Sequence, residues 1–388
     1  MQHHRFEHGA VSLFIVVFTA LLITVVTVSF IRIMVRDQQQ ATSVDLSQSA
    51  YDSAQAGVED AKRAVLRYQT VCASADAQAC IDAKKNLDSD DCNVSLTGIS
   101  TVVDNEVKIK QANGDVAAFD QAYTCVKVSL QTNNYIGALS QDASKLIPLV
   151  GVSAFDTIKV DWFSAKDLQG STKTVDVPPI SEGTMLLVPA VWKAPNSQNR
   201  PSVMRAQLMQ FGTGNDPTNG FMLSDFDGDP SVNTGGISDA STLFLYPSAT
   251  PVSSAIFASN VRKSPSSPTA IHCSATLDSG GYACSATITL PAPVGGGTRT
   301  AYLNLTSLYK ASSYQVTMLS AGQVVDFDTV QPQVDSTGRA NDLFRRVQSR
   351  IETVPGVYPQ AAIDITGNFC KDFAITDKTT DYSNKCTL

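Results

Sequence analysis

The sequence predicts an α+β protein: a long N-terminal helix, membrane-spanning in its first half, packed on a disulfide-stabilised, mostly antiparallel β-rich head. Three observations lead to this class. An uncharged apolar stretch near the N-terminus runs without a break into a helix-prone segment. All eight cysteines lie beyond that stretch. The rest of the chain alternates short β-branched and aromatic runs with Gly, Pro, Ser and Asn clusters, the pattern of antiparallel sheet.

The apolar stretch is Ala10–Ile31, which carries no charge. As a helix its 22 residues would span roughly 33 Å, enough to cross the hydrocarbon core of a bilayer. A secretory signal peptide has a shorter apolar run and ends at a small-residue cleavage site. Here the helical pattern continues instead, since Arg32–Tyr68 contains one glycine and no proline. The stretch therefore predicts a membrane-spanning helix.

The extension Arg32–Tyr68 has an apolar face that repeats every three or four residues along a helix. That face consists of Val44, Tyr51, Ala54, Val58, Ala61, Val65 and Tyr68. Polar side chains occupy the other face, where Glu59 and Arg63 are spaced for an i,i+4 ion pair; they are Asp45, Gln48, Asp52, Gln55, Glu59, Asp60, Lys62 and Arg63. Gly57 costs this helix about 1 kcal/mol relative to alanine, which indicates that another element approaches it closely.

A short polar leader ending in Gly9, an apolar helix start and an unbroken amphipathic second half together resemble the N-terminus of type IV pilins and pseudopilins. The segment AYDSAQAGVEDAKRAV, Ala50–Val65, is similar to the A-x-x-A-x-A-G-x-E-x-A pattern of the large minor pilins. The resemblance covers Gly9–Tyr68, under a fifth of the chain. It implies a leader over 1–9, cleavage by prepilin peptidase between Gly9 and Ala10, and a pilin-type helix over 10–68 with 10–31 in the membrane.

Two positions depart from the pattern of major pilins. The first mature residue would be Ala10 in place of a methylated Phe, and the fifth would be Phe14 where major pilins carry Glu. The large minor pilins and the tip pseudopilin of type II secretion also lack that Glu. The resemblance is therefore to the large minor pilin subfamily.

Charge and cysteine usage narrow the function classes further. A formal net charge of -7 argues against a broadly basic surface that coats nucleic acid. Eight cysteines without a CxxC pair favour disulfides in an oxidising, exported environment over zinc or redox motifs. The arginines oppose the positive-inside rule, since Arg5 precedes the span while Arg32 and Arg36 follow it. The cysteines and the resemblance together predict export of the body.

Residues 69–132 carry four cysteines, and the resemblance identifies this part as the variable region that follows the pilin helix. A helix-prone piece at Ala75–Leu87 and an alternating strand at Tyr123–Gln131 lie within it. Pairing by proximity would join Cys72 to Cys80 and Cys92 to Cys125, but four cysteines allow three connectivities and the sequence does not choose.

Residues 133–388 read as the β-rich head. Its predicted strands are Asp156–Phe163, Thr184–Trp192, Val203–Phe211, Thr242–Tyr246, Tyr282–Leu290, Arg299–Leu305, Ser313–Leu319, Val324–Val330 and Leu343–Thr353. Ala270–Leu290 reads as a hairpin that brings Cys273 opposite Cys284 or diagonal to it, depending on which two residues turn. Cys370 and Cys386 bracket a polar loop over 370–386, whose closure would contribute about 3 kcal/mol; this loop resembles the C-terminal disulfide loop of type IV pilins.

Candidate sites are few. The histidines are His3, His4, His8 and His272, and only His272 lies beyond the leader. One histidine cannot build a typical zinc site, and a Ser-His-Asp arrangement would have to use His272, which is expected to be an ordinary strand residue; the sequence therefore predicts no enzyme. Asp225, Asp227 and Asp229 could bind calcium, although the stretch is no EF-hand and a solvated turn explains it as well. Trp162 and Trp192 are expected in the core. A basic strip for DNA or an anionic partner, or else a solvated edge-strand face, is expected from Arg345, Arg346, Arg350 and Lys371.

The resemblance implies a minor, tip-proximal subunit of a type IV pilus with a structural, assembly and surface-interaction role in adhesion, motility or DNA uptake. The implied partners are other pilin subunits, the cytoplasmic membrane before assembly, prepilin peptidase, and a host surface or DNA. The precursor would be membrane-inserted with an exported head, and the assembled subunit would lie at the cell surface. The alternatives are a non-polymerising, membrane-anchored adhesin or carbohydrate-binding protein, and a type II secretion pseudopilin.

Overall fold

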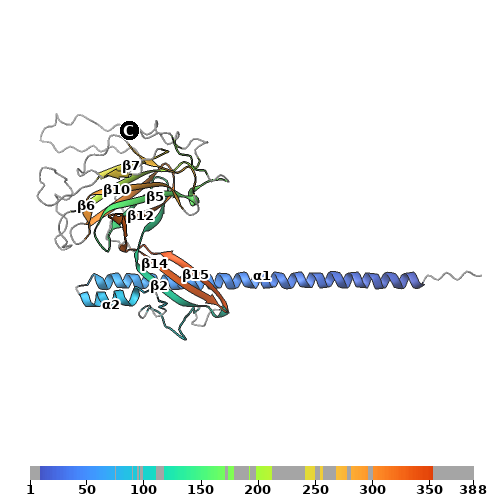
Figure 1. Cartoon of the computed structure of the whole chain (residues 1–388). Coiled ribbons are helices and arrows are strands. Elements are labelled where there is room, and N and C mark those ends of the chain that lie inside the picture. The colour runs from blue at the N-terminus through green and yellow to red at the C-terminus, as the bar shows by residue number, and fades with distance from the viewer. Residues whose placement is uncertain are drawn as a thin grey trace, which may run out of the picture. The chain divides into compact units, whose positions relative to one another are not determined.

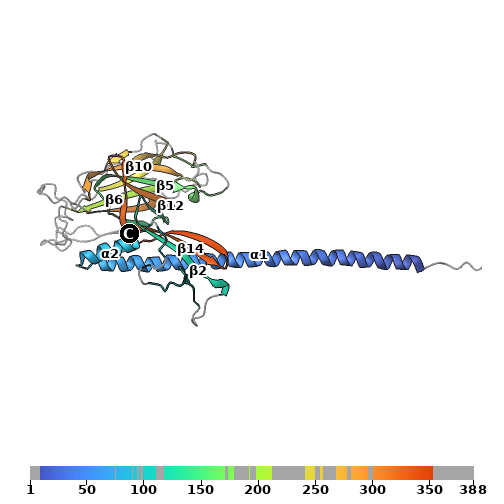
Figure 2. The ribbon, with the colours of Figure 1, turned by 60° about the horizontal axis from the view of Figure 1, so that its bottom comes forward.

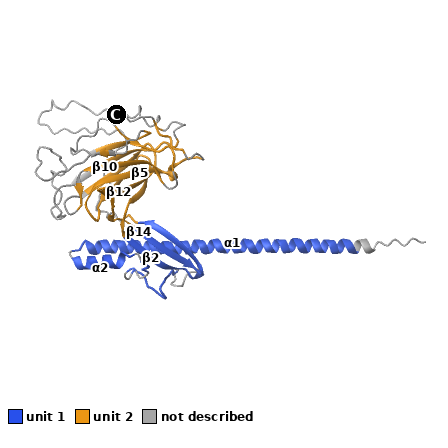
Figure 3. Cartoon of the chain, viewed as in Figure 1, with its two compact units in different colours: residues 1–129, 333–350 blue, residues 130–332, 351–388 orange. Residues whose placement is uncertain are grey.

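The structure, a computed structural model, describes residues 9–74, 76–89, 91–93, 96, 99–110, 118–170, 174–178, 192, 198–211, 241–249, 254–256, 268–277, 281–295 and 300–352. The chain forms two compact units (Figure 3). Unit 1 is Met1–Ser129 with Gln333–Arg350, and unit 2 is Leu130–Pro332 with Ile351–Leu388. The segment 333–350, expected in the head, thus returns to the unit that holds the long helix.

Unit 1 is built on α1 (Gly9–Cys72), a single helix of 64 residues (Figure 1). Its length follows from the absence of proline over the whole range and from a single interior glycine, Gly57. The expected continuous helix is therefore present and extends four residues beyond Tyr68. At its C-terminal end it is followed by α2 (Ala77–Leu87), which Asp76 caps by accepting the Ala79 N–H at 3.0 Å.

The buried face of α1 differs from the predicted stripe. Val44 is 60% and Tyr51 40% exposed, so the stripe is wrong at both positions. The side chains that α1 buries are small, apart from one valine: Ala50, Ser53, Ala54, Ala61, Ala64 and Val65, with Gly57 between them. The neighbouring sheet approaches too closely to admit large side chains, and this closeness decides which face is covered.

That sheet has the order β1 (Val107–Lys108), β2 (Ala122–Thr132), β14 (Phe327–Ala340) and β15 (Leu343–Arg350). It lies against the C-terminal half of α1 in both Figure 1 and Figure 2. β14 and β15 form an antiparallel hairpin whose last pair is Ala340 with Leu343. The two-residue turn between them suits Asn341, which adopts a left-handed φ of 47°.

Unit 2 contains two sheets. The first has the order β13 (Gln323–Val325), β12 (Ser312–Ser320), β5 (Phe155–Ser164), β10 (Tyr282–Val294) and β8 (Ser254–Ile256), with β3 (Tyr135–Leu139) also paired to β12. The second has the order β4 (Ser144–Leu149), β11 (Thr300–Leu308), β6 (Val203–Phe211), β7 (Ser241–Ser248) and β9 (Thr269–His272). Only β8–β10 and β7–β9 pair in parallel among the described strands, so the sheets are mostly antiparallel, as predicted.

Alternate residues of both sheets bury one shared core, as expected where two sheets pack face to face. Ile158, Val160 and Trp162 of β5 belong to it together with Ala206 and Leu208 of β6. The Trp162 indole N–H donates to the Ser202 carbonyl at 3.0 Å. Trp192 packs with Val203, Tyr246 and Tyr309 in a second, smaller cluster. Both tryptophans are thus core residues, as predicted.

Two strand predictions in unit 2 need correction. Val324–Val330 is not one strand, because β13 ends at Val325 and β14 begins at Phe327 and runs to Ala340. Ala270–Leu290 is not a simple hairpin either. β9 pairs in parallel with β7 of one sheet, while β10 pairs with β5 of the other. Among the described residues, the two arms of the expected hairpin form a β-pair only at the bridge between Cys273 and Cys284. The predicted strand Thr184–Trp192 lies, apart from Trp192, outside the described residues.

Candidate functional site

The N-terminal half of α1 presents an apolar surface that none of the described residues covers. Every large apolar side chain from Leu13 to Ile31 is between 44% and 72% exposed. A soluble surface rarely carries so long an apolar patch, which indicates contact with lipid or with other proteins. This helix is long and apolar enough to cross a membrane.

Four hydroxyl groups interrupt this apolar surface, and each is satisfied within the helix. Thr19, Thr24, Thr27 and Ser29 each donate to the carbonyl four residues earlier, at 2.7–2.8 Å. A polar group that keeps its hydrogen bond costs little in an apolar medium, whereas an unpaired one costs several kcal/mol. The segment is therefore chemically compatible with a bilayer along its whole length.

Two glycines hold the other half of α1 tightly against the sheet of unit 1. A Cβ at Gly57 would collide with the Ser336 Oγ and lie 3.1 Å from Val126 Cγ2. A Cβ at Gly338 of β14 would collide with the backbone of Ala50 and Ala54 in α1. Another element thus approaches α1 closely at Gly57, as the sequence predicted, and at Gly338 the backbone of the sheet approaches the backbone of the helix.

Asp60 of α1 lies in this contact rather than on the expected solvated face. Its Oδ2 accepts from the Tyr123 hydroxyl at 2.8 Å and from the Ser100 hydroxyl. Burial, the largest cause, raises the pKa of Tyr123, so its hydroxyl keeps its proton and donates. Arg63 pairs with Asp60 at 3.1 Å, which replaces the predicted i,i+4 partner Glu59.

A four-charge cluster ties β14 to β1 and to the turn Ala118–Asp120. Arg339 contacts Glu106 through Nε and Nη2, both at 2.6 Å, in a bidentate pair, and its Nη2 also lies 2.9 Å from Asp120 Oδ2. Lys108 Nζ lies 2.6 Å from both carboxylates. The hydrogen bond from Arg339 is the main cause of a lowered pKa at Glu106, and the hydrogen bond from Lys108 is the main cause of a lowered pKa at Asp120.

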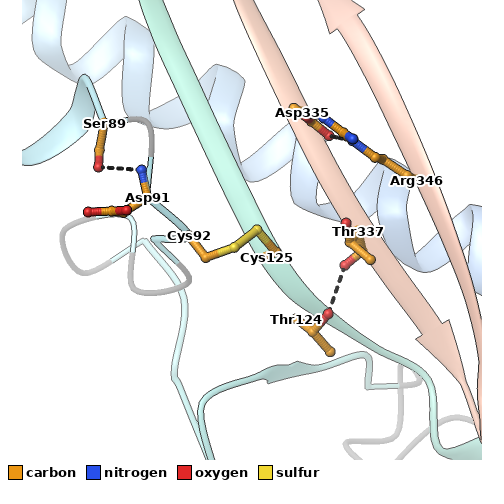
Figure 4. The surroundings of a disulfide bond; sticks show 8 residues. All are labelled: Ser89, Asp91, Cys92, Thr124, Cys125, Asp335, Thr337 and Arg346. Atoms are coloured by element: carbon orange, nitrogen blue, oxygen red, sulfur yellow. Dashed lines mark hydrogen bonds and ion pairs between the residues drawn. A yellow bond between two sulfur atoms is a disulfide. The ribbon is translucent and has the colours of Figure 1, made fainter.

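Three disulfides join described residues: Cys72–Cys80, Cys92–Cys125 and Cys273–Cys284. The first two are the pairs expected from proximity, and the third is the pair expected in the hairpin segment. Cys72–Cys80 links the ends of α1 and α2. Cys92–Cys125 attaches the segment before β1 to β2 (Figure 4).

The structure does not test the predicted cleavage site, and most of the remaining predicted site residues lie outside its described part. α1 begins at Gly9, with Ala10 next in the helix, and nothing in the structure tests cleavage between them. Asp225, Asp227, Asp229, Lys371, Cys370 and Cys386 lie outside the described residues. Within the described ranges, no three His, Cys, Asp or Glu side chains come together in a way that could hold a metal ion.

The expected basic strip is not a free row of cations. Arg346 pairs with Asp335 across the β14–β15 hairpin (Figure 4), and Arg345 Nε donates to the Ser47 hydroxyl at 2.9 Å. Burial lowers the pKa of Arg350, which is a half-buried side chain. Arg345 and Arg346 therefore bond to neighbouring elements, which weakens the case for a dedicated DNA-binding surface.

Comparison of the chain with models of protein families, with curated proteins and with solved structures finds no match in any of the three.

Proposed function

We propose that the protein is a minor, tip-proximal subunit of a type IV filament, with a structural and assembly role and a head available for surface contacts. The observation that carries the proposal is the division of α1 within one unbroken helix. Its first half exposes an apolar surface on which the four hydroxyls from Thr19 to Ser29 are satisfied, and its second half is packed through glycines onto a sheet. Such a helix can hold a precursor in a membrane and later pack among the helices of a filament core.

The disulfides support the exported part of the proposal. Three disulfides in the described part of the chain fit an oxidising compartment. The resemblance around Gly9 and Ala50–Val65 supplies the expected partners: prepilin peptidase, the cytoplasmic membrane and other pilin subunits. A type II secretion pseudopilin would share all of these features, and neighbouring genes for a filament ATPase or a secretion channel would separate the two.

Processing of the N-terminus tests the proposal. We expect the mature protein to begin at Ala10, and we expect Gly9→Val to leave an uncleaved precursor because the peptidase requires a small residue at that boundary. Mass spectrometry of the mature N-terminus measures both. A mature chain that retains Met1, or that is cut beyond the apolar stretch, would assign the protein to the membrane-anchored or secreted adhesins instead. Gly9→Ser is the matched control, because serine is smaller than valine; if side-chain size decides cleavage, Gly9→Ser should be cleaved more than Gly9→Val.

A further inference from the structure

One end of unit 1 exposes two phenylalanines, on two segments that a hydrogen bond joins. Phe344 of β15 is 55% exposed, and Phe119, in the turn before β2, is 40% exposed. The Asn341 N–H, in the turn of the β14–β15 hairpin, donates to the Phe119 carbonyl at 2.7 Å. We call Phe119, Asn341, Asp342, Leu343 and Phe344 together the tip of unit 1.

The backbone of the tip is held in conformations that side chains rarely adopt. Phe119 has a φ of 64°, and Asp120 and Asn341 both have a φ of 47°. Asparagine and aspartate tolerate this region, but for an aromatic residue it is strained. Arg339 holds the two turns together, because its Nη1 donates to the carbonyls of Asp120 at 3.1 Å and Asn341 at 3.3 Å. Strain of this kind persists where function uses it, and an aromatic ring that the fold holds outward contributes little to the core.

The contacts of the hairpin show which way the tip points along α1. Gly338 lies against Ala50 and Ala54, and Arg345, its partner across the hairpin, reaches Ser47. Further toward the turn, Leu343 shares a groove with α1 residues from Val35 to Leu46. The hairpin therefore runs toward the apolar half of α1, and the tip is its nearest part.

The groove that Leu343 shares with α1 begins at the depth of the outer layer of a bilayer. Val35 lies four residues beyond Ile31, about 6 Å along the helix, and the headgroup layer is about 5–7 Å thick on each side of the hydrocarbon core. The far end of the groove, at Leu46, lies about 22 Å from Ile31. Membrane helices tilt by about 20° on average, and a tilt toward the sheet brings the tip closer to the headgroups.

We propose that the tip of unit 1 contacts the headgroup layer of the membrane that α1 crosses, with Phe119 and Phe344 as interfacial anchors. Elements that lie in this layer bury Trp, Phe and Leu side chains at the boundary between headgroups and acyl chains. This arrangement places three exposed arginines beside the lipid phosphates, Arg32, Arg36 and Arg345. Two exposed carboxylates, Asp37 and Asp342, lie in the same region, so the positive charges outnumber the negative ones. The bond from Arg345 goes to the neutral Ser47 hydroxyl and leaves its charge for phosphate. The contact would set the tilt of the precursor, and it rests on the proposed insertion of α1.

Depth-dependent quenching of tryptophan tests the contact on the full chain. Phe119→Trp and Phe344→Trp place a probe at the tip, and Phe18→Trp places one in the apolar span. Ile81→Trp is the matched control, since Ile81 is 58% exposed on α2, beside the other end of α1. The proteins are reconstituted into vesicles of phosphatidylethanolamine and phosphatidylglycerol with brominated acyl chains. Trp162 and Trp192, which are buried, give the same background in every variant.

We expect strong quenching at position 18, intermediate quenching with a blue-shifted emission at 119 and 344, and none above background at 81. Quenching at 18 with 119 and 344 no different from 81 would overturn the tip contact and leave the inserted helix standing. The absence of quenching at 18 would overturn the proposed insertion and the tip contact together. A blue shift at 344 that follows protein density and not bromination would assign the tip to a second copy of the chain, which also overturns the membrane contact.

Discussion

Gly57 and Gly338 set the distance between α1 and the sheet of unit 1. Each has the other element's atoms where its own Cβ would be. A helix normally loses about 1 kcal/mol by carrying glycine in place of alanine. Here that loss of helix stability is offset because the sheet is buried against the alanines of α1. A larger side chain at either glycine would prevent this contact.

A side chain at position 57 should therefore separate the two elements. We expect Gly57→Leu to lower the free energy of unfolding of unit 1 by about 1–3 kcal/mol through overpacking, despite the better helix propensity of leucine. Ala41→Leu, at an exposed position of the same helix, should change it by less than about 0.5 kcal/mol. Thermal and urea unfolding followed by circular dichroism compare them, and equal stability of the two variants would contradict the close contact.

Glu106 gives unit 1 a defined pH dependence. Its pKa in the folded protein is lowered from 4.5, first by the hydrogen bond from Arg339 and with a further contribution from Lys108. A lowered pKa means that the carboxylate stabilises the fold above the unfolded pKa, and that this contribution is lost as pH falls through the folded value. The same sign holds for Asp120, which shares both cations.

We expect Glu106→Gln to cost about 2 kcal/mol at pH 7, the range of a charge-assisted hydrogen bond that is lost. The difference from wild type should be constant above about pH 5.5 and shrink below pH 4.5 as the wild-type carboxylate protonates. Glu59→Gln is the control, because Glu59 is 63% exposed and 3.9 Å from Lys62, a pair worth less than about 1 kcal/mol. A difference in unfolding free energy between wild type and Glu106→Gln that does not change with pH would contradict this prediction. It would show that the negative charge of Glu106 does not stabilise the fold.

At the scale of elements, two disulfides restrain unit 1 over very different lengths of chain. Cys72–Cys80 closes eight residues of sequence separation between α1 and α2, whereas Cys92–Cys125 closes 33. Cross-linking limits the unfolded chain more when the closed loop is longer. The longer link also has local support, since the Asn93 N–H donates to the Val126 carbonyl of β2 at 2.8 Å.

Removal of the longer-loop disulfide should lower the free energy of unfolding more than removal of the shorter-loop disulfide. In the chain-entropy model, the double variant Cys92→Ala/Cys125→Ala loses about 4 kcal/mol and Cys72→Ala/Cys80→Ala about 2.5 kcal/mol. Thermal unfolding of the two proteins, with their remaining disulfides verified by non-reducing peptide mapping, measures the order. A larger loss for the shorter loop would mean that docking of α2 on α1, and not loop closure, dominates.

At the scale of the whole molecule, the proposed place of the chain in a filament is argued from its N-terminus and its size. In major pilins the Glu at the fifth mature position is thought to pair with the N-terminal amine of a neighbour. Phe14 cannot accept from an amine, so this chain lacks the bond that would guide it beneath an existing subunit. A subunit at the end of a filament has no neighbour above it and loses nothing. Some 320 residues beyond the helix would also crowd a regular lattice.

Immunogold labelling of the head on sheared filaments should therefore mark filament ends. Replacing Phe14 by glutamate supplies the missing carboxylate. Because the large head remains, we expect Phe14→Glu to stay at the ends, so that bulk and charge are tested separately. Wild-type label spread evenly along the shaft would contradict a terminal position.

The sequence alone determined the features that depend on local order and composition. The continuous helix follows from 37 residues without proline after an uncharged span, and the strands Val203–Phe211 and Tyr123–Gln131 follow from alternation that the structure reproduces within a residue. Gly57 is informative for the same reason, because a glycine inside a strong helical pattern needs a neighbour to explain it. Pairing by proximity was one of three connectivities that the sequence left open for the first four cysteines, and the structure has that pairing, in keeping with the lower entropy cost of closing shorter loops.

Only the tertiary structure decided which surfaces meet. The predicted face of α1 was wrong at Val44 and Tyr51 because hydrophobic periodicity counts bulk, whereas the sheet selects small side chains. The sequence placed Asp60 on the solvated face of the helix, whereas in the fold Asp60 accepts hydrogen bonds from Tyr123 and Ser100. The pairing of Arg339 with Glu106 spans 233 residues of sequence, and so does not appear in any local pattern. The exposed tip is likewise invisible in sequence, because the strain at Phe119 arises from a hairpin more than 200 residues later in the chain, which only folding brings beside it.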